Sequence, residues 1–132
     1  LLNKIYNYQY YKCLYCYNIT LEWTFTTKTQ GTWRDLFIYC SLVASHKELI
    51  LYQVHEGVEF PESQDEQFSG RVQSDKDVLS EGRIRLHVLK MEDSGFYVCK
   101  LTIGRCMGLD TCDLTVTGKS VNLYFEVRTV FC

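Results

Sequence analysis

The stretch Leu86–Cys99 constrains the fold of this chain more than any other part of its sequence. It joins an alternating apolar segment, the turn-forming residues from Asp93 to Gly95, and a second segment in which Tyr97 precedes Cys99 by two residues. Asp and Ser hydrogen-bond backbone groups in turns, and glycine relaxes the usual backbone limits. Because strand side chains alternate, Tyr97 and Cys99 share one face of the second segment. The stretch therefore predicts a strand, a tight corner and a second strand, with Cys99 pointing into a core.

Seven cysteines in 132 residues indicate an oxidising compartment, so we expect an extracellular protein. Asn18-Ile-Thr is an acceptor for N-glycosylation and fits the same compartment. The length argues for one domain over residues 1–132. The formal net charge of -2 comes from positive and negative residues mixed along the chain, and the absence of a basic stripe in the sequence argues against a nucleic-acid partner. No signal peptide and no apolar run of membrane-spanning length is visible, so we expect a mature secreted domain or the ectodomain of a larger membrane protein.

Short alternating segments separated by turn residues predict eight or nine β-strands and no amphipathic helix. The expected strands lie near residues 11–17, 21–25, 33–43, 49–54, 68–72, 83–88, 96–103 and 121–130. Residues 1–11 are compatible with either an edge strand or a frayed start. We expect a loop at 60–67, a charged turn-rich segment at 74–82 and a long hairpin region with two cysteines at 104–118. Strands of this length and spacing predict an all-β, antiparallel sandwich or barrel, and the corner at Asp93–Cys99 favours the β-sandwich.

Two motifs resemble the variable-type immunoglobulin set, namely Phe68-Ser-Gly-Arg-Val72 and Asp93-Ser-Gly-Phe-Tyr-Val-Cys99. The resemblance covers about residues 11–130. It implies a V-type sandwich of two sheets with Greek-key connections, in which the tyrosine of the second motif forms a tyrosine corner by bonding to the upstream backbone. It also implies that Arg71 and Asp93 face each other as an Arg–carboxylate fork.

The same resemblance implies a disulfide between the two sheets, packed against a tryptophan on the strand after the first cysteine. Trp23 lies ten residues after Cys13, which leaves space for the end of one strand, a loop and the start of the next. We therefore expect a Cys13–Cys99 disulfide beside Trp23. The alternative pair, Cys40 with Cys99, would leave few residues for the additional edge strands and would give Trp23 no role.

A narrower resemblance is to the ectodomains of voltage-gated sodium-channel beta subunits of the beta-1 and beta-3 type. It depends on Cys13-Leu-Tyr-Cys16, Glu22-Trp-Thr-Phe25 and Asp35-Leu-Phe-Ile-Tyr39. The resemblance implies a membrane-anchored glycoprotein whose immunoglobulin domain lies on the extracellular surface of the channel. Such a domain modulates gating and can mediate cell adhesion.

The remaining cysteines leave several pairings open. Cys106 and Cys112 lie in one predicted hairpin region, so we expect a local disulfide that stiffens it. Cys16 would pair with Cys40, with Cys132 or with nothing, and Cys132 is also available to cross-link another chain. A redox role for the Cys-Leu-Tyr-Cys motif is disfavoured because its surroundings are strand-like, and a zinc site with the hairpin cysteines is disfavoured because their spacing is too long.

No residue pattern indicates an enzyme, and we expect no catalytic residue, metal or cofactor. His46, His55 and His87 lie far apart in the sequence, on expected loops or on an outward strand face. No glycine-rich phosphate loop is present, and the acidic run at 59–66 is typical of a solvated loop.

The sequence instead predicts a protein-binding module, tethered to a membrane in the full-length protein. As an auxiliary channel domain, it would bind the channel alpha subunit and shift the gating equilibrium by differential affinity for its states. As an adhesion or immune-receptor variable domain, it would use a sheet face to meet another immunoglobulin domain. The candidate anchors on that face are the aromatic residues Tyr39, Tyr52, Phe96 and Tyr124.

Overall fold

The structure, a computed structural model, describes residues 2–8, 16–17, 19–26, 33–78, 81–87, 89–125 and 129–131. These residues form antiparallel β-strands and four 3-10 turns, and they contain no α-helix. The strands build a four-stranded sheet, a seven-stranded sheet and a two-stranded ladder. None of the described segments is a helix with the length and hydropathy that crossing a bilayer requires. The prediction of a mostly antiparallel β fold is thus confirmed.

The smaller sheet has four strands, and its first strand comes from the N-terminal segment that the sequence left ambiguous. In spatial order the strands are β1 (Leu2–Tyr8), β3 (Ile19–Thr26), β8 (Glu81–Leu86) and β7 (Val72–Val78). β1 pairs with β3 along its whole length.

The larger sheet has seven strands and forms the second layer of the molecule. In spatial order they are β12 (Val121–Phe125), β11 (Cys106–Val116), β10 (Gly95–Ile103), β4 (Leu36–Val43), β5 (Glu48–His55) and β6 (Val58–Glu59), and β13 (Thr129–Phe131) also pairs with β11. The ladder consists of β2 (Cys16–Tyr17) and β9 (Leu89–Lys90). The 3-10 turns are η1 (Trp33–Asp35), η2 (Pro61–Ser63), η3 (Glu66–Phe68) and η4 (Met91–Asp93).

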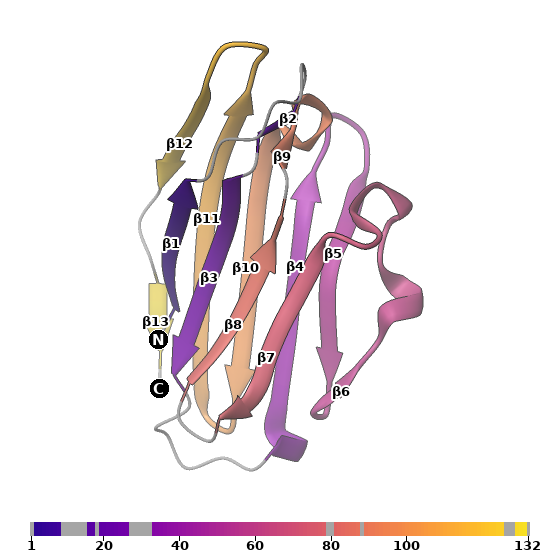
Figure 1. Cartoon of the computed structure of the whole chain (residues 1–132). Coiled ribbons are helices and arrows are strands. Elements are labelled where there is room, and N and C mark those ends of the chain that lie inside the picture. The colour runs from indigo at the N-terminus through magenta and orange to yellow at the C-terminus, as the bar shows by residue number, and fades with distance from the viewer. Residues whose placement is uncertain are drawn as a thin grey trace.

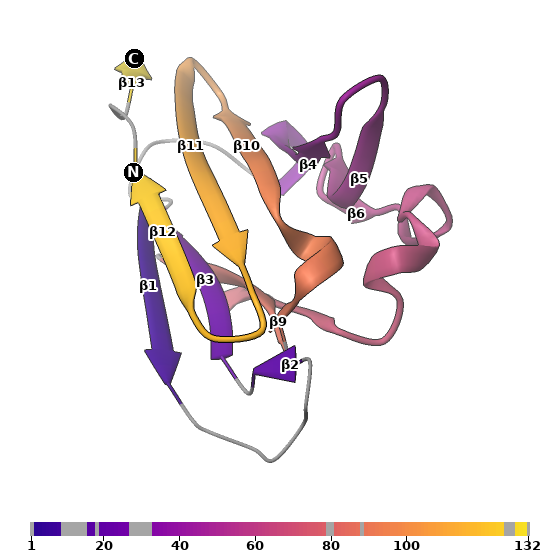
Figure 2. The same ribbon diagram turned by 90° about the horizontal axis from the view of Figure 1, so that it is seen from above.

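The two sheets lie face to face as two layers, as the front view and the view from above both show (Figures 1 and 2). Apolar side chains from both sheets fill the space between them, because alternate residues of each strand point inward. Trp23 of β3 is fully buried, and its ring centroid lies 6.0 Å from that of Tyr97 on β10. The core also contains Leu21, Ile84 and Leu86 from the smaller sheet and Leu36, Ile38, Leu42, Leu51, Val54, Leu101, Ile103, Leu114 and Val116 from the larger one.

Three segments differ from the structure that the sequence predicts. Residues 104–118 form a two-residue turn and the long strand β11 instead of a local hairpin. Residues 74–78 continue β7 instead of forming a charged turn, because β7 is the edge strand of its sheet, where charged residues are tolerated. Residues 121–130 form the separate strands β12 and β13 along the same edge of β11. In each case pairing with a neighbouring strand overrides the local composition.

Candidate functional site

The corner between β9 and β10 has the predicted geometry. The Tyr97 hydroxyl donates to the backbone carbonyl of Asp93, four residues upstream, and burial raises the pKa of Tyr97. Arg71 Nη1 donates to Asp93 Oδ2 at 2.6 Å and Nη2 donates to Oδ1 at 2.8 Å, so the predicted Arg–carboxylate fork is confirmed. Asp93 is fully buried and also accepts a hydrogen bond from the backbone N–H of Lys90 at 2.7 Å. The hydrogen bond from Arg71 to Asp93 raises the pKa of Arg71. These bonds close one end of the core.

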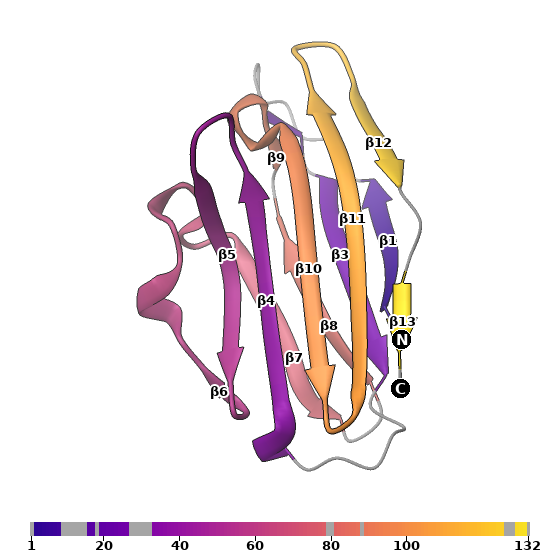
Figure 3. The same cartoon turned by 180° about the vertical axis from the view of Figure 1, so that it is seen from behind.

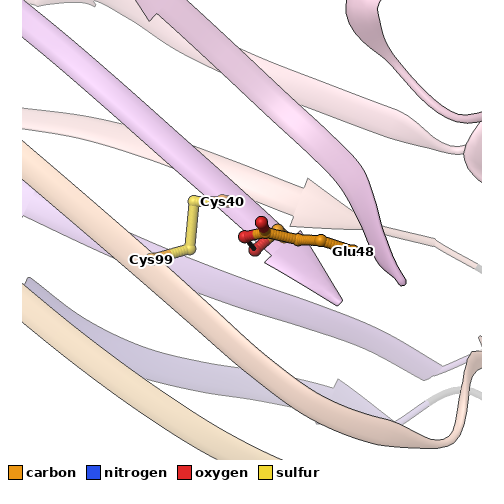
Figure 4. The surroundings of a disulfide bond; sticks show 4 residues. Cys40, Glu48 and Cys99 are labelled. Atoms are coloured by element: carbon orange, nitrogen blue, oxygen red, sulfur yellow. Dashed lines mark hydrogen bonds between the residues drawn. A yellow bond between two sulfur atoms is a disulfide. The ribbon is translucent and has the colours of Figure 1, made fainter. Parts of the chain in front are cut away.

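The disulfide at the centre of the core joins Cys99 to Cys40, so the predicted Cys13–Cys99 pair is wrong. Cys40 on β4 and Cys99 on β10 are direct register partners on adjacent strands of one sheet, with a Cα–Cα distance of 4.1 Å (Figure 4). The prediction assumed that the first core strand carries a cysteine and the next strand the tryptophan. In the structure β3 carries Trp23 and the following strand, β4, carries Cys40. Cys13 lies outside the described residues.

The predicted Cys106–Cys112 disulfide is also wrong. Both residues lie on β11, six positions apart, which separates their Cα atoms by about 20 Å in an extended strand. A disulfide requires a Cα–Cα distance below about 7 Å, and the same separation rules out a shared zinc ion. Cys112 is fully buried in the core. Cys16 begins β2, whereas Asn18 and Cys132 lie outside the described residues.

The candidate binding site is the face of the larger sheet that points away from the smaller sheet, which we call the outer face. On β10 the residues Tyr97, Cys99, Leu101 and Ile103 are buried, so the intervening residues point to the opposite side. Strand pairing extends this assignment to β4, β5 and β11. The outer face consists of Phe37, Tyr39, Ser41, Val43, Glu48, Ile50, Gln53, Phe96, Val98, Lys100, Thr102, Met107, Leu109, Thr111 and Asp113.

No described element covers the outer face, which points toward the viewer in Figure 3. Near its centre Val98 lies between the polar residues Ser41 and Thr111, while Phe96 is paired with Val43. Val43 is 43% exposed and Met107 47% exposed, although both are large apolar residues, and they lie toward opposite ends of the face. We call Val43, Phe96 and Val98 the apolar centre of this face, and neighbouring apolar side chains that stay uncovered favour a protein-binding site.

A polar contact stiffens one side of the outer face. The Ser41 hydroxyl, on a residue that is 1% exposed, donates to Glu48 Oε1 at 2.6 Å across the β4–β5 pair. Burial raises the pKa of Tyr39, and so do the charge of the neighbouring Glu48 carboxylate and a hydrogen bond to it. Figure 4 shows that Glu48 lies beside β4, close to the disulfide.

Two of the four predicted aromatic anchors lie on the outer face. Tyr39 and Phe96 are partly exposed there. Tyr52 is only 8% exposed and belongs to the core, so its prediction as an anchor is wrong. The physical reason is a register shift between β4 and β5, which pairs Tyr52 with the inward-facing Cys40. The side chain of Tyr124 lies outside the described part of the structure.

A pocket of about 140 Å³ lies where β5 and β6 approach β7 and η2. The hydroxyls of Tyr52 and Ser74 donate to Glu59 Oε1 at 2.9 Å and 2.8 Å, and burial raises the pKa of Tyr52. Ser74 belongs to the smaller sheet and the other two residues to the larger one. The pocket therefore contains a polar contact that links the two sheets at their edges.

The sequence reasoning did not single out Lys100 and Asp113, the exposed charged residues of β10 and β11 on the outer face. The alternation that places Tyr97 and Cys99 inward also places Lys100 outward, so a signal for Lys100 was present. No such signal indicated the position of Asp113, because the sequence predicts a loop around that residue.

Neither a scan against protein-family models nor a search of curated proteins gave a match for this chain.

Proposed function

We propose that this chain is a variable-type immunoglobulin domain that acts as an extracellular binding module. The tyrosine corner, the fork between Arg71 and Asp93, and two facing antiparallel sheets support this assignment. The pairing of β10 with both β4 and β11 fits the same architecture. The disulfide supports an oxidising, extracellular location.

One feature distinguishes the chain from the usual pattern of this fold. There, the disulfide links the two sheets and the tryptophan lies on the strand after the first cysteine. Here the two residue types are exchanged: Trp23 projects into the core from the smaller sheet, while Cys40 and Cys99 are bonded within the larger one. Each residue still fills an inward position of the core, so the exchange is compatible with the proposed fold.

The proposed binding surface is the outer face, and the proposed partner is another cell-surface domain of the immunoglobulin type. The single observation that carries the proposal is the uncovered apolar centre formed by Val43, Phe96 and Val98. Burying such a surface against a flat partner provides a hydrophobic driving force, and the partly exposed ring of Tyr39 at its border adds aromatic contact area. The pairing of two flat sheet faces requires no deep cleft.

We favour this function over an auxiliary role on a sodium channel. The resemblance to channel beta subunits depends on a cysteine in the first core strand and a tryptophan in the next. Trp23 lies instead on β3 of the smaller sheet, and Cys99 is bonded to Cys40. The same exchange departs from the usual pattern of adhesion domains too, so the core does not separate the two functions, and what favours the adhesion role is the uncovered apolar centre of the outer face.

The proposal is tested by binding the chain to a panel of cell-surface ectodomains and to cells that express a sodium-channel alpha subunit. We expect an immunoglobulin-type ectodomain to bind, and Val98→Arg to weaken the interaction at least about tenfold, because a charge then replaces the apolar centre. Met91→Arg is the matched control, since Met91 is 47% exposed but lies in η4, outside the outer face. Partner binding that is unchanged by Val98→Arg would exclude the outer face, and binding to the channel alone would favour the auxiliary role.

A further inference from the structure

Two opposite charges lie on either side of the apolar centre of the outer face. Lys100 of β10 and Asp113 of β11 are both exposed, and within the described part of the chain neither makes an ion pair. The other acidic group on this face, Glu48, already accepts a hydrogen bond from Ser41. Among the described residues of this face, Lys100 and Asp113 are therefore a cation and an anion that are available to a molecule covering it.

Register fixes the distance between these two charges. Lys100 is paired with Leu109, and Asp113 is paired with Phe96, which lies four residues from Lys100 along β10. Four residues span about 13 Å in a strand, too far for Lys100 and Asp113 to neutralise each other within one molecule. Between them lies the apolar centre of the outer face, which includes Val98.

A two-fold axis converts this arrangement into a self-complementary surface. In an isologous dimer, if residue i of one copy contacts residue j of the other, then j also contacts i. When the axis lies in the plane of the interface, passes between Val98 and Thr111 and runs perpendicular to the line that joins Lys100 to Asp113, it exchanges the positions of these two residues. Each Lys100 then meets Asp113 of the other copy, and the apolar centres are buried against each other.

We propose that the outer face binds a second copy of this chain, through two reciprocal Lys100–Asp113 ion pairs around an apolar centre. This proposal rests on the proposed function, because it names the occupant of the same surface. The four strands β5, β4, β10 and β11 offer a flat area of roughly 400 Å² per copy, or about 800 Å² in total, which is below the roughly 1,000 Å² of a stable interface and in the range of weak, transient ones. The dimer is therefore weak in solution and forms most readily between molecules concentrated on opposed or shared membranes.

The test measures the dissociation constant of the whole chain by sedimentation velocity, at concentrations from about 1 to about 500 μM, which bracket a weak interface. We expect Lys100→Asp and Asp113→Lys each to weaken self-association about 100-fold, because each reversal creates two like-charge contacts. The double variant Lys100→Asp/Asp113→Lys exchanges the charges and should restore the dissociation constant to within about threefold. Lys119→Asp and Glu62→Lys are matched reversals at exposed positions outside the outer face and should leave it unchanged.

A wild-type chain that remains monomeric over this range overturns the proposal, as does a dimer that either single reversal leaves intact or that the double variant fails to restore. These results are distinct from failure of the proposed function. If the chain binds a different ectodomain and Val98→Arg abolishes that binding, the outer face is a binding site but its occupant is not a second copy.

Discussion

The covalent pair at the centre of the core yields the most direct prediction, which concerns the variant Cys40→Ala/Cys99→Ala. The disulfide closes a loop with a sequence separation of 59. In the chain-entropy model, opening such a loop lowers the free energy of unfolding by about 4 kcal/mol, because the unfolded chain gains freedom. With a urea slope of about 2 kcal/mol/M for a domain of this size, the midpoint should fall by about 2 M.

Stability alone does not identify the partner of Cys99. The predicted Cys13–Cys99 bond would close a loop of 86 residues (99 minus 13), and the same model gives a difference of only about 0.3 kcal/mol between the two loops. The deciding measurement is therefore non-reducing peptide mapping by mass spectrometry. We expect a cross-linked peptide that contains Cys40 and Cys99, and we expect Cys13→Ala to leave that peptide intact.

Two results would refute this reasoning. A peptide that links Cys13 to Cys99 would contradict the strand pairing of β4 with β10 directly. The second result is a urea midpoint that shifts by less than about 0.5 M in the double variant although the wild type contains the Cys40–Cys99 peptide. It would show that the disulfide does not stabilise the chain by closing a loop in the unfolded state.

Three further changes test the corner next to this core. Asp93→Asn should lower the free energy of unfolding by about 3–5 kcal/mol in a urea titration, because it leaves the buried Arg71 guanidinium without its counter-charge. Glu92→Gln, at the exposed neighbouring position, is the control and should change the same quantity by less than about 0.5 kcal/mol. Gly95→Ala should lower the free energy of unfolding by about 1–3 kcal/mol, because the φ of Gly95 is +144° and an added Cβ would lie 2.6 Å from the buried side chain of Leu42. Gly118→Ala is the control, since no atom lies within 4 Å of the added Cβ. Equal effects of the two variants on the thermal midpoint would contradict the clash. Burial raises the pKa of Tyr97, so above about pH 10 the unfolded chain releases this proton more readily, and stability should fall by about 1.4 kcal/mol per pH unit from this group. Tyr97→Phe should remove that part of the slope in urea titrations between about pH 9 and pH 11, and an unchanged slope would show that another group is responsible.

Local spacing was sufficient to predict the corner. The turn residues, the tyrosine two positions before the cysteine and the fork with Arg71 all depend on short-range geometry or on one well-defined motif. The alternation of β8 was equally accessible, because Ile84 and Leu86 are buried and separated by one partly exposed residue. The corner and the alternation follow from rules that act within a few residues, whereas the fork joins residues 22 positions apart and was implied only by the resemblance of the two motifs.

The disulfide partner could not be derived in this way, because it depends on which strand lies next to β10. Trp23 and Cys40 both occupy inward positions on successive strands, so their exchange leaves the apolar pattern of the sequence unchanged. The prediction of Tyr52 as a binding anchor failed for a similar reason, because the alternation of β5 alone does not reveal a register shift in the β4–β5 pair. Cys106 and Cys112 would be close if the chain reversed between them, and pairing with β10 keeps that segment extended instead.

The position of the disulfide connects the core to the proposed function. Cys40 lies between Tyr39 and Ser41, and Cys99 lies between Val98 and Lys100, so the bond fixes the register of two strands that carry the outer face. A slip of one residue in this pair would turn their outward side chains into the core. A disulfide between sheets would restrain the distance between the layers, whereas the Cys40–Cys99 bond lies within one sheet, and among the described residues packing such as the contact of Trp23 with Tyr97 joins the two layers. This covalent constraint therefore acts within the sheet that we propose as the binding surface, where it would hold the surface in one arrangement before a partner arrives and so reduce the ordering cost of association.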